Sequence, residues 1–135
     1  RLIDAIDPQA TNRVEIHDIQ SFMEFVKGRV ALLGDAAHNT TPAIGQGGCA
    51  AMEDAVVLAS VLASHSLSLE DSLLRYQQRR NERVKDLILK ARKRCDVTHA
   101  KDPQVTEAWY QALTREDGVN VLAGMCETIE GGPLG

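Results

Sequence analysis

The sequence predicts an α/β chain that is mainly helical, with one or two short strands near its beginning. Two observations predict this. Short apolar segments suited to strands precede residue 34, and four segments after residue 47 carry apolar residues at helical spacing. The composition is that of a folded protein, because 44% of the residues are hydrophobic and 25% are charged. With 135 residues the chain has the length of one domain and can bury a core.

Two strands are expected before residue 34. Val14–Ile19 roughly alternates apolar and polar side chains, which is typical of a half-buried strand. Phe22–Val26 then leads to a turn at Lys27–Gly28. Val30–Leu33 is continuously apolar, which favours a strand buried on both faces of a parallel sheet. A parallel strand needs parallel neighbours, and the sequence offers no second run of this kind. The neighbours are therefore expected from another chain or from a missing part.

The first long helix is expected over residues 50–63, where apolar positions recur at intervals of three and four. Its predicted buried stripe consists of Met52, Ala55, Val56, Ala59, Leu62 and Ala63. The next helix begins after Ser68, an N-cap that Asp71 can complete as in a capping box, and it reaches about Arg94. Its stripe, interrupted near Arg80, consists of Leu69, Leu73, Tyr76, Val84, Leu87, Ile88 and Ala91.

Two further helices are expected toward the end of the chain. One covers Pro103–Arg115 and begins with a proline, which suits the first turn of a helix. Asp117–Gly118 breaks it, and Val119–Ile129 forms the last helix. Met52 and Met125 lie on apolar stripes, so both are expected in the core.

The segment between Val30–Leu33 and the first long helix carries the candidate chemistry. Asp35 follows the expected strand, and Gly45–Gly48 opens the helix. Glycines let a ligand approach the backbone, and the unpaired amides of a first helical turn favour an anionic ligand atom. A carboxylate such as that of Asp35 can accept hydrogen bonds from sugar or polyol hydroxyls. The pattern fits a large cofactor with hydroxyls at one point and an electron-rich group at another. It fits equally well a glycine-rich loop that only turns the chain into a helix.

Composition argues against several other functions. A net charge of −4 and only five aromatic residues disfavour a nucleic-acid surface, so the nine basic residues between positions 75 and 94 are expected on a solvated helix face. No apolar run approaches the roughly 20 residues that a membrane span needs. Three separated cysteines fit a reducing cytoplasm better than a disulfide framework or a zinc site.

Single histidines and cysteines give weaker signals. His38 is expected to be a structural residue near the loop, because no second ligand pair accompanies it, and no metal site is assigned. Cys49 is expected to be a small packed residue beside the ligand. The other histidines, expected at the surface or at helix ends, are His17, His65 and His99.

These segments resemble a known family. The second FAD-binding motif of the flavin-dependent aromatic hydroxylases, single-component monooxygenases of the p-hydroxybenzoate hydroxylase type, is similar to Gly28–His38, Pro42, Gly45–Gly47 and Glu53–Ala55. A Tyr-x-x-x-Arg-x-x-Arg pattern on the following helix of that family is similar to Tyr76, Arg80 and Arg83. Within the family, the bacterial urate-hydroxylating members are the most similar, on Thr40–Pro42, Gly45–Leu58, Arg94–His99 and Gly132–Gly135.

The resemblance implies FAD as the cofactor and NAD(P)H as co-substrate. Asp35 would accept a hydrogen bond from a ribityl hydroxyl, and Pro42 would line the substrate side of the ring. The residues whose amides would lie along the pyrimidine edge, where they would stabilise negative charge on the reduced flavin, are Gly45, Gln46, Gly47, Gly48 and Cys49. Many family members have asparagine where Cys49 stands, but the urate-hydroxylating members share the cysteine. The implied reaction is hydroxylation of urate through a flavin C4a-hydroperoxide, in purine breakdown.

In terms of this family, residues 1–135 are expected to be the C-terminal part of the FAD-binding domain in an FAD/NAD(P)-binding, Rossmann-like monooxygenase fold. The N-terminal dinucleotide fingerprint and most of the substrate domain are absent from the sequence. No catalytic side chain is therefore assigned, and the chain by itself is expected to be inactive. The expected partners are a small-molecule substrate, urate or another aromatic compound, and either the missing N-terminal part or a second copy of the chain. The alternatives are a hydroxylase of another aromatic substrate, such as salicylate, or a silent helical remnant that dimerises.

Overall fold

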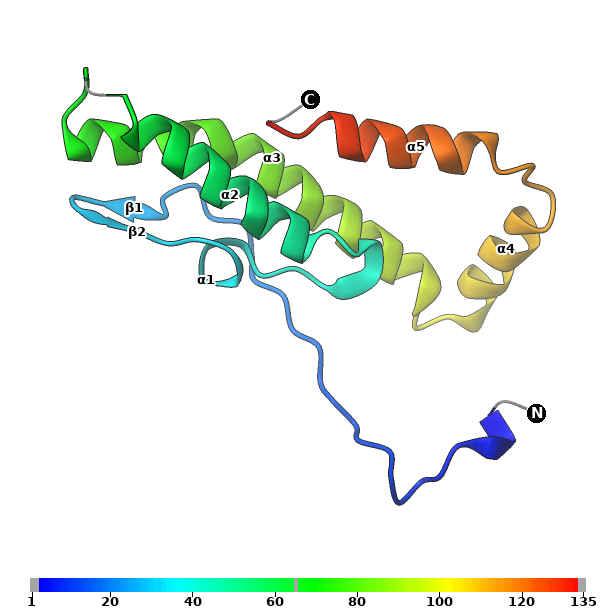
Figure 1. The fold of residues 1–135 in the computed structure, drawn as a ribbon. Helices are drawn as coiled ribbons and strands as arrows, with labels where there is room; N and C mark the ends of the chain where they lie inside the picture. Colours follow the sequence, from blue (N-terminus) through cyan, green and yellow to red (C-terminus); the bar gives the residue numbers. More distant parts are fainter. Residues whose placement is uncertain (1–2, 65, 134–135) are drawn as a thin grey trace.

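The structure, a computed structural model, describes residues 3–64 and 66–133, and it is mainly helical with one two-stranded sheet, as predicted. The described part begins with a short 3₁₀ helix, η1 (Ile3–Ala5), followed by an extended arm that leads toward the other elements (Figure 1). The strand predicted at Val14–Ile19 is wrong, because these residues form no strand and most of them are exposed. Within the described ranges no other strand lies beside the arm to pair with it.

The arm leads into a short hairpin. Strands β1 (Val26–Lys27) and β2 (Val30–Ala31) pair in antiparallel register, and Gly28 makes the turn between them with φ of +57°. The buried parallel strand predicted at Val30–Leu33 is therefore wrong, and its first side chain is 63% exposed. A tight turn pairs two neighbouring segments in antiparallel fashion, whereas parallel pairing requires a crossover connection.

Two short helical turns, α1 (Asp35–His38) and η2 (Pro42–Ile44), connect the hairpin to helix α2 (Gly47–Leu62). Helix α2 begins three residues before the predicted position, and its predicted buried stripe is wrong. The side chains buried on α2 are Ala50, Asp54, Val57 and Val61, whereas Met52 is 64% exposed. Both faces of α2 are rich in apolar residues, and the buried face carries a carboxylate. The spacing of apolar residues therefore predicted burial of the face that is exposed in the structure.

Helix α3 (Leu69–Thr98) is the longest element and lies beside α2 in the opposite direction (Figure 1). The predicted cap is confirmed, since the Asp71 amide donates to Ser68 Oγ at 3.1 Å and the Ser68 hydroxyl donates to the Asp71 carboxylate at 2.7 Å. The predicted stripe is confirmed except at Leu69, which is exposed. The residues buried on α3 are Ser72, Leu73, Tyr76, Arg80, Val84, Leu87, Ile88 and Ala91. Arg80 thus belongs to the buried stripe and does not interrupt it.

Helices α4 (Pro103–Leu113) and α5 (Val119–Glu130) confirm the two predicted C-terminal helices. The Asp102 side chain caps α4 by accepting from the Gln104 amide at 2.9 Å. No side chain of either helix is buried, so the placement of Met125 in the core is wrong. Among the scattered histidines, His65 lies outside the described residues, His17 is exposed, and His99 is the C-cap of α3.

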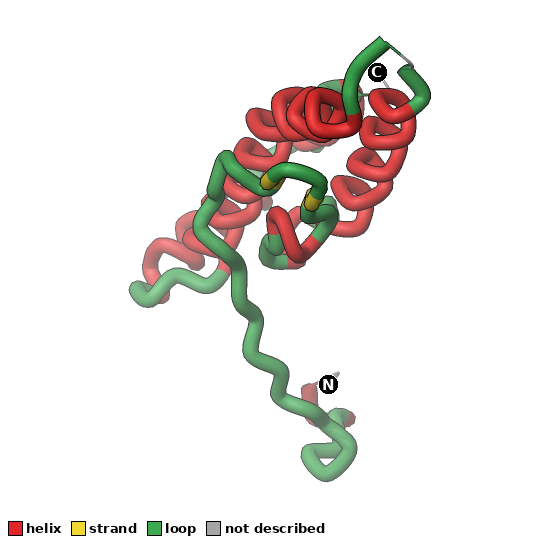
Figure 2. The backbone as a smooth tube through the Cα atoms, turned by 90° about the vertical axis from the view of Figure 1, so that its left-hand side faces the viewer, coloured by secondary structure: helices red, strands yellow, loops and turns green. Residues whose placement is uncertain are grey.

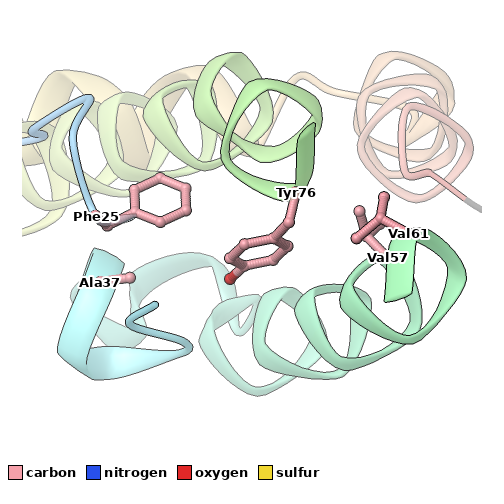
Figure 3. Close-up of a cluster of buried hydrophobic side chains, with 5 residues drawn as sticks. All are labelled: Phe25, Ala37, Val57, Val61 and Tyr76. Carbon is pink, nitrogen blue, oxygen red and sulfur yellow. The ribbon is translucent and has the colours of Figure 1, made fainter. Parts of the chain in front are cut away.

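The core lies between the hairpin and the α2–α3 pair, and Figure 2 shows the hairpin and α1 beside these helices. Tyr76 reaches from α3 toward α2, between Phe25 on one side and the α2 valines on the other (Figure 3). The Phe25 and Tyr76 rings meet edge to face, with centroids 5.6 Å apart. The remaining members of the core cluster are Ala37, Val57 and Val61. Among the described helices, none combines the length and the apolar character that crossing a bilayer would require.

Candidate functional site

A tight turn at Gly34 delivers Asp35 to the end of the hairpin. Gly34 is buried and has φ of +55°, a conformation that favours glycine. A Cβ placed there would lie 3.3 Å from the Ala51 Cβ of α2, so the turn is packed closely against this helix. Asp35 follows in the first turn of α1 with its side chain exposed. The predicted hydroxyl-binding carboxylate is therefore open to a ligand.

The glycine-rich segment lies at the beginning of α2, as predicted. Gly45 adopts the left-handed conformation, with φ of +66°, and its amide donates to the Pro42 carbonyl at 3.0 Å. Gln46 is the N-cap residue of α2, and no side chain caps the helix there. Gly47–Cys49 forms the first turn, whose amides have no acceptor within a helix and carry partial positive charge.

This end of α2 leaves room for a ligand. A Cβ added at Gly45 or Gly48 would meet nothing within 4 Å, and one at Gly47 would make only an ordinary contact, 3.6 Å from Thr40 Cγ2. Cys49 is exposed at this turn, and its predicted packing beside the ligand stays a prediction. Close backbone approach is therefore possible along the whole turn.

The Gly34 turn and the first turns of α2 are held together by a buried carboxylate on α2. Asp54 Oδ2 accepts from the Gly34 amide at 2.8 Å and lies 2.5 Å from His38 Nε2. An ionised carboxylate can only accept, so the imidazole donates. Asp54 Oδ1 accepts from Arg80 Nε at 2.6 Å, and both of these side chains are 0% exposed. His38 is thus a buried structural residue, as the sequence predicted.

A second carboxylate extends this arrangement toward the surface. Glu53 Oε2 accepts from Arg80 Nη1 at 2.7 Å and from Arg83 Nε at 3.2 Å, while Glu53 Oε1 accepts from Arg83 Nη2 at 2.8 Å. Arg80 Nη2 also donates to the Ala50 carbonyl at 3.1 Å. We call the five charged or titratable side chains the buried ion cluster; they are His38, Glu53, Asp54, Arg80 and Arg83. The cluster connects α1, α2 and α3 at the turn that precedes Asp35.

The carboxylates and arginines of this cluster were part of the family resemblance, but no role was predicted for them. The available signal was the pairing of Glu53–Asp54 on one predicted helix with Arg80 and Arg83 at i, i+3 spacing on the next. The nine basic residues of α3 were expected on a solvated face, and this is wrong for Arg80, which is fully buried. A buried arginine requires a carboxylate partner, and here it has two.

Both carboxyl groups of the buried ion cluster favour their ionised form. Burial alone would raise the pKa of Asp54, but the hydrogen bonds from His38, the Gly34 amide and Arg80 outweigh it and lower the pKa below its ordinary value. The same opposition applies to Glu53, where burial raises the pKa and the bonds from Arg83 and Arg80 lower it further than burial raises it. Burial raises the pKa of Tyr76, which is therefore neutral.

These shifts predict acid lability. A carboxyl whose pKa is lower in the folded chain makes the unfolded chain bind more protons as the pH falls, so its stabilising effect is present at neutral pH and is lost in acid. The ordinary pKa values are 4.5 for Glu53 and 3.8 for Asp54. We expect the unfolding temperature to fall as the pH is lowered through this range and below it. Circular dichroism melts over a pH series measure this. Glu53→Gln should make the acid limb shallower, and an equally steep limb in that variant would contradict the assignment.

A cleft of about 700 Å³ borders the η2 turn. Pro42, Thr41 and Cys95 contribute to its wall, and the Cys95 thiol of α3 donates to Thr41 Oγ1 at 3.3 Å. The other polar residues of the wall come from the end of α3 and the start of α4; they are Asp96, His99, Lys101 and Asp102. Pro42, three residues before Gly45, thus borders a space large enough for a small molecule.

Comparison with known proteins gives three findings. A family described as an FAD binding domain matches residues 4–91. The FAD-dependent urate hydroxylase of Klebsiella pneumoniae is 62% identical over 135 residues, which are 100% of this chain and 35% of that protein. The enzyme of the same name from Mycolicibacterium vanbaalenii is 61% identical over 133 residues, which are 98% of this chain and 34% of that protein.

The solved structures agree. The crystal structure of Klebsiella pneumoniae HpxO complexed with FAD and uric acid is 62% identical and has a TM-score of 0.90 over 99% of this chain and 34% of that one. The predicted monooxygenase fold is thereby confirmed. The chain spans about a third of the length of the relatives that it matches.

Proposed function

The chain belongs to the FAD binding domain family, and from this premise we propose that it is the C-terminal part of an FAD-dependent monooxygenase that hydroxylates urate. The observation that carries the proposal is the open glycine-rich turn at the start of α2, held beside the Asp35 turn by the buried ion cluster. The identity of 62% to a urate hydroxylase over the whole chain supports urate rather than another aromatic substrate.

The residues present fit FAD. Asp35 has an exposed carboxylate that can accept a hydrogen bond from a ribityl hydroxyl. The first-turn amides of Gly47–Cys49, together with Gly45 and Gln46, can donate to the pyrimidine edge, because a Cβ-free backbone permits close approach. Bound FAD would supply the reaction with NAD(P)H and oxygen. The amides of this chain would stabilise the negative charge that develops there on reduction.

Substrate and partners follow from the same arrangement. The cleft beside Pro42 supports a small planar substrate on that side of the η2 turn. No side chain of this chain is assigned a catalytic role. The exposed apolar face of α2, around Met52 and Val56, supports association with an N-terminal part that carries the dinucleotide fingerprint. Three free cysteines support a cytoplasmic protein.

A chimera tests this function. The matching segment of the Klebsiella pneumoniae urate hydroxylase is replaced by residues 1–135 of this chain. We expect the chimera to purify with FAD and to oxidise NAD(P)H faster when urate is added, while salicylate gives no such increase. FAD content is measured by absorbance, and NAD(P)H consumption by its loss of absorbance. A folded chimera that lacks FAD would contradict the proposal. Faster NAD(P)H oxidation with salicylate but not with urate would show that urate is not the substrate.

The same chimera tests the role of Asp35. Asp35→Ala should weaken FAD binding about tenfold to a hundredfold, since one hydrogen bond to a charged group is removed. Asp86→Ala, which removes an exposed carboxylate from α3, is the control and should leave FAD affinity unchanged. Equal FAD affinity in the two variants would show that Asp35 makes no contact with the cofactor.

A further inference from the structure

The turn that follows α5 lies against the buried ion cluster. A Cβ added at Gly132 would lie only 2.9 Å from Glu53 Oε1 and 3.3 Å from the Ile129 carbonyl. One added at Gly131 would lie 3.5 Å from Arg83 Nη1. Within α5 itself no side chain is buried. The glycines after the helix thus bring the C-terminal end of the described chain onto Glu53.

Space, and not backbone conformation, demands glycine at position 132. The described glycines with positive φ are Gly28, Gly34, Gly45 and Gly118, and neither Gly131 nor Gly132 is among them. Gly131 has φ of −69°, which any residue can adopt. An alanine at 132 would therefore not be forced into a left-handed conformation, and its main effect would come from its contact with the Glu53 carboxylate and the Ile129 carbonyl.

The Glu53 carboxylate cannot move aside freely. The end of an ordinary exposed glutamate yields easily to a new methyl group, but here both oxygens are held. Oε1 accepts from Arg83, and Oε2 accepts from both Arg80 and Arg83. Moving the carboxylate away from Gly132 would lengthen these charge-assisted bonds, which are the strong class of hydrogen bond.

The displacement would reach the Gly34 turn through two further contacts. Arg80 is fully buried and is held between Glu53 and Asp54, so a shift of one carboxylate changes its position relative to the other. Asp54 in turn accepts from the Gly34 amide, which precedes Asp35. A continuous chain of hydrogen bonds therefore joins Glu53, against which the Gly132 backbone lies, to the candidate cofactor turn at the other side of α2.

We propose that Gly132 is a positioning residue for the cofactor-binding turn. The C-terminal turn closes over Glu53 without a side chain and keeps its carboxylate directed at Arg80 and Arg83, so the buried ion cluster holds Gly34 and Asp35 in place. The relevance to FAD rests on the proposed function, whereas the connection from Gly132 to Gly34 does not. The turn after α5 thereby acts on the Gly34 turn through Glu53.

Selective labelling of the ten glycines with ¹⁵N gives a direct test, because each Gly amide is a separate reporter in an NMR spectrum of the chain. Gly132→Ala should shift the Gly34 amide resonance. Gly124→Ala is the matched control, since a Cβ at that position of α5 meets nothing within 4 Å. It should leave the Gly34 resonance in place. In the FAD-binding chimera, Gly132→Ala should weaken FAD affinity about threefold to thirtyfold, the usual range for coupling through a network, and Gly124→Ala should not.

Glu53→Ala separates a positioning role from a purely local one. In that background the carboxylate is gone, so Gly132→Ala should no longer shift the Gly34 amide. The inference would be overturned if Gly132→Ala still shifted the Gly34 amide resonance in the Glu53→Ala background. It would also be overturned if Gly132→Ala alone gave a folded chain with an unchanged Gly34 amide resonance. If Gly132→Ala does not fold, a chain truncated after Glu130 provides the test. The truncation removes the contact between the C-terminal turn and Glu53 without adding a methyl group, and it should shift the Gly34 amide resonance. An unmutated chimera that lacks FAD would refute the proposed function. The NMR test of the connection from Gly132 to Gly34 would still be valid, because it does not depend on FAD.

Discussion

Replacing Asp54 by alanine is expected to destabilise the chain by about 3–5 kcal/mol, because a buried arginine then loses one of its two carboxylate partners. Arg80 is 0% exposed, so water cannot replace the lost oxygen. The Gly34 amide and the His38 imidazole lose their acceptor as well. Since small proteins are stable by only about 5–15 kcal/mol, this loss is a large fraction of the total free energy of unfolding.

Urea unfolding followed by far-UV circular dichroism measures this effect. The control is Asp86→Ala, which removes an exposed carboxylate from α3 and should change the free energy of unfolding by less than about 0.5 kcal/mol. The double variant Asp54→Leu with Arg80→Met should recover part of the loss, because it removes both charges and keeps apolar volume. A loss below about 1 kcal/mol for Asp54→Ala would show that the buried ion cluster does not hold the turn.

Replacing Tyr76 by alanine should cost about 3–5 kcal/mol through a different mechanism, the opening of a cavity. Tyr76 is 0% exposed and packs between Phe25 and the α2 valines, so its ring joins the hairpin to both long helices. Its hydroxyl also donates to the Leu32 carbonyl at 3.2 Å. Tyr76→Phe keeps the ring and should cost only about 1 kcal/mol, the usual net value of one hydrogen bond.

The second tyrosine provides the control. Tyr110 lies on α4 and is 53% exposed, so Tyr110→Ala should change the free energy of unfolding by less than about 0.5 kcal/mol. The same urea titrations apply. If Tyr76→Ala and Tyr110→Ala cost the same, the ring of Tyr76 does not organise the core.

The helices could be predicted because their boundaries are local. Ser68 caps α3, Pro103 opens α4 behind the Asp102 cap, and Gly118 separates the last two helices. Each of these signals depends on residues within one turn of the boundary, which a sequence displays directly. The long helices were therefore found to within a few residues.

The residues that pack against each face of a helix or strand could not be predicted, because they lie far apart in the sequence. The apolar run beginning at Val30 suggested a buried strand, but in the structure it pairs only with its neighbour across a turn. On α2 the apolar spacing favoured the face of Met52, and the buried face contains Asp54. Three partners far from Asp54 in the sequence make that burial favourable, and they are the Gly34 amide, His38 and Arg80.

In the candidate site, too, local features could be predicted from the sequence and long-range contacts could not. Asp35 and Gly45–Cys49 could be proposed as site residues because a carboxylate after an apolar run and glycines before a helix are local patterns. The residues that hold these two segments together could not. A charged residue in a helical stripe looks like a solvated position until its partner is known, as Arg80 shows. The dependence on Gly132 is less visible still, because its effect is the absence of a side chain.

The exposed apolar face of α2 favours self-association of the purified chain in solution. Methionine, valine and leucine side chains at positions 52, 56 and 62 are open to water on one helix. Identical molecules carrying such a surface stick to one another as they become crowded, and kosmotropic salts strengthen the tendency. Dilute samples at modest ionic strength are therefore the conditions under which individual molecules, and not their clusters, would be observed.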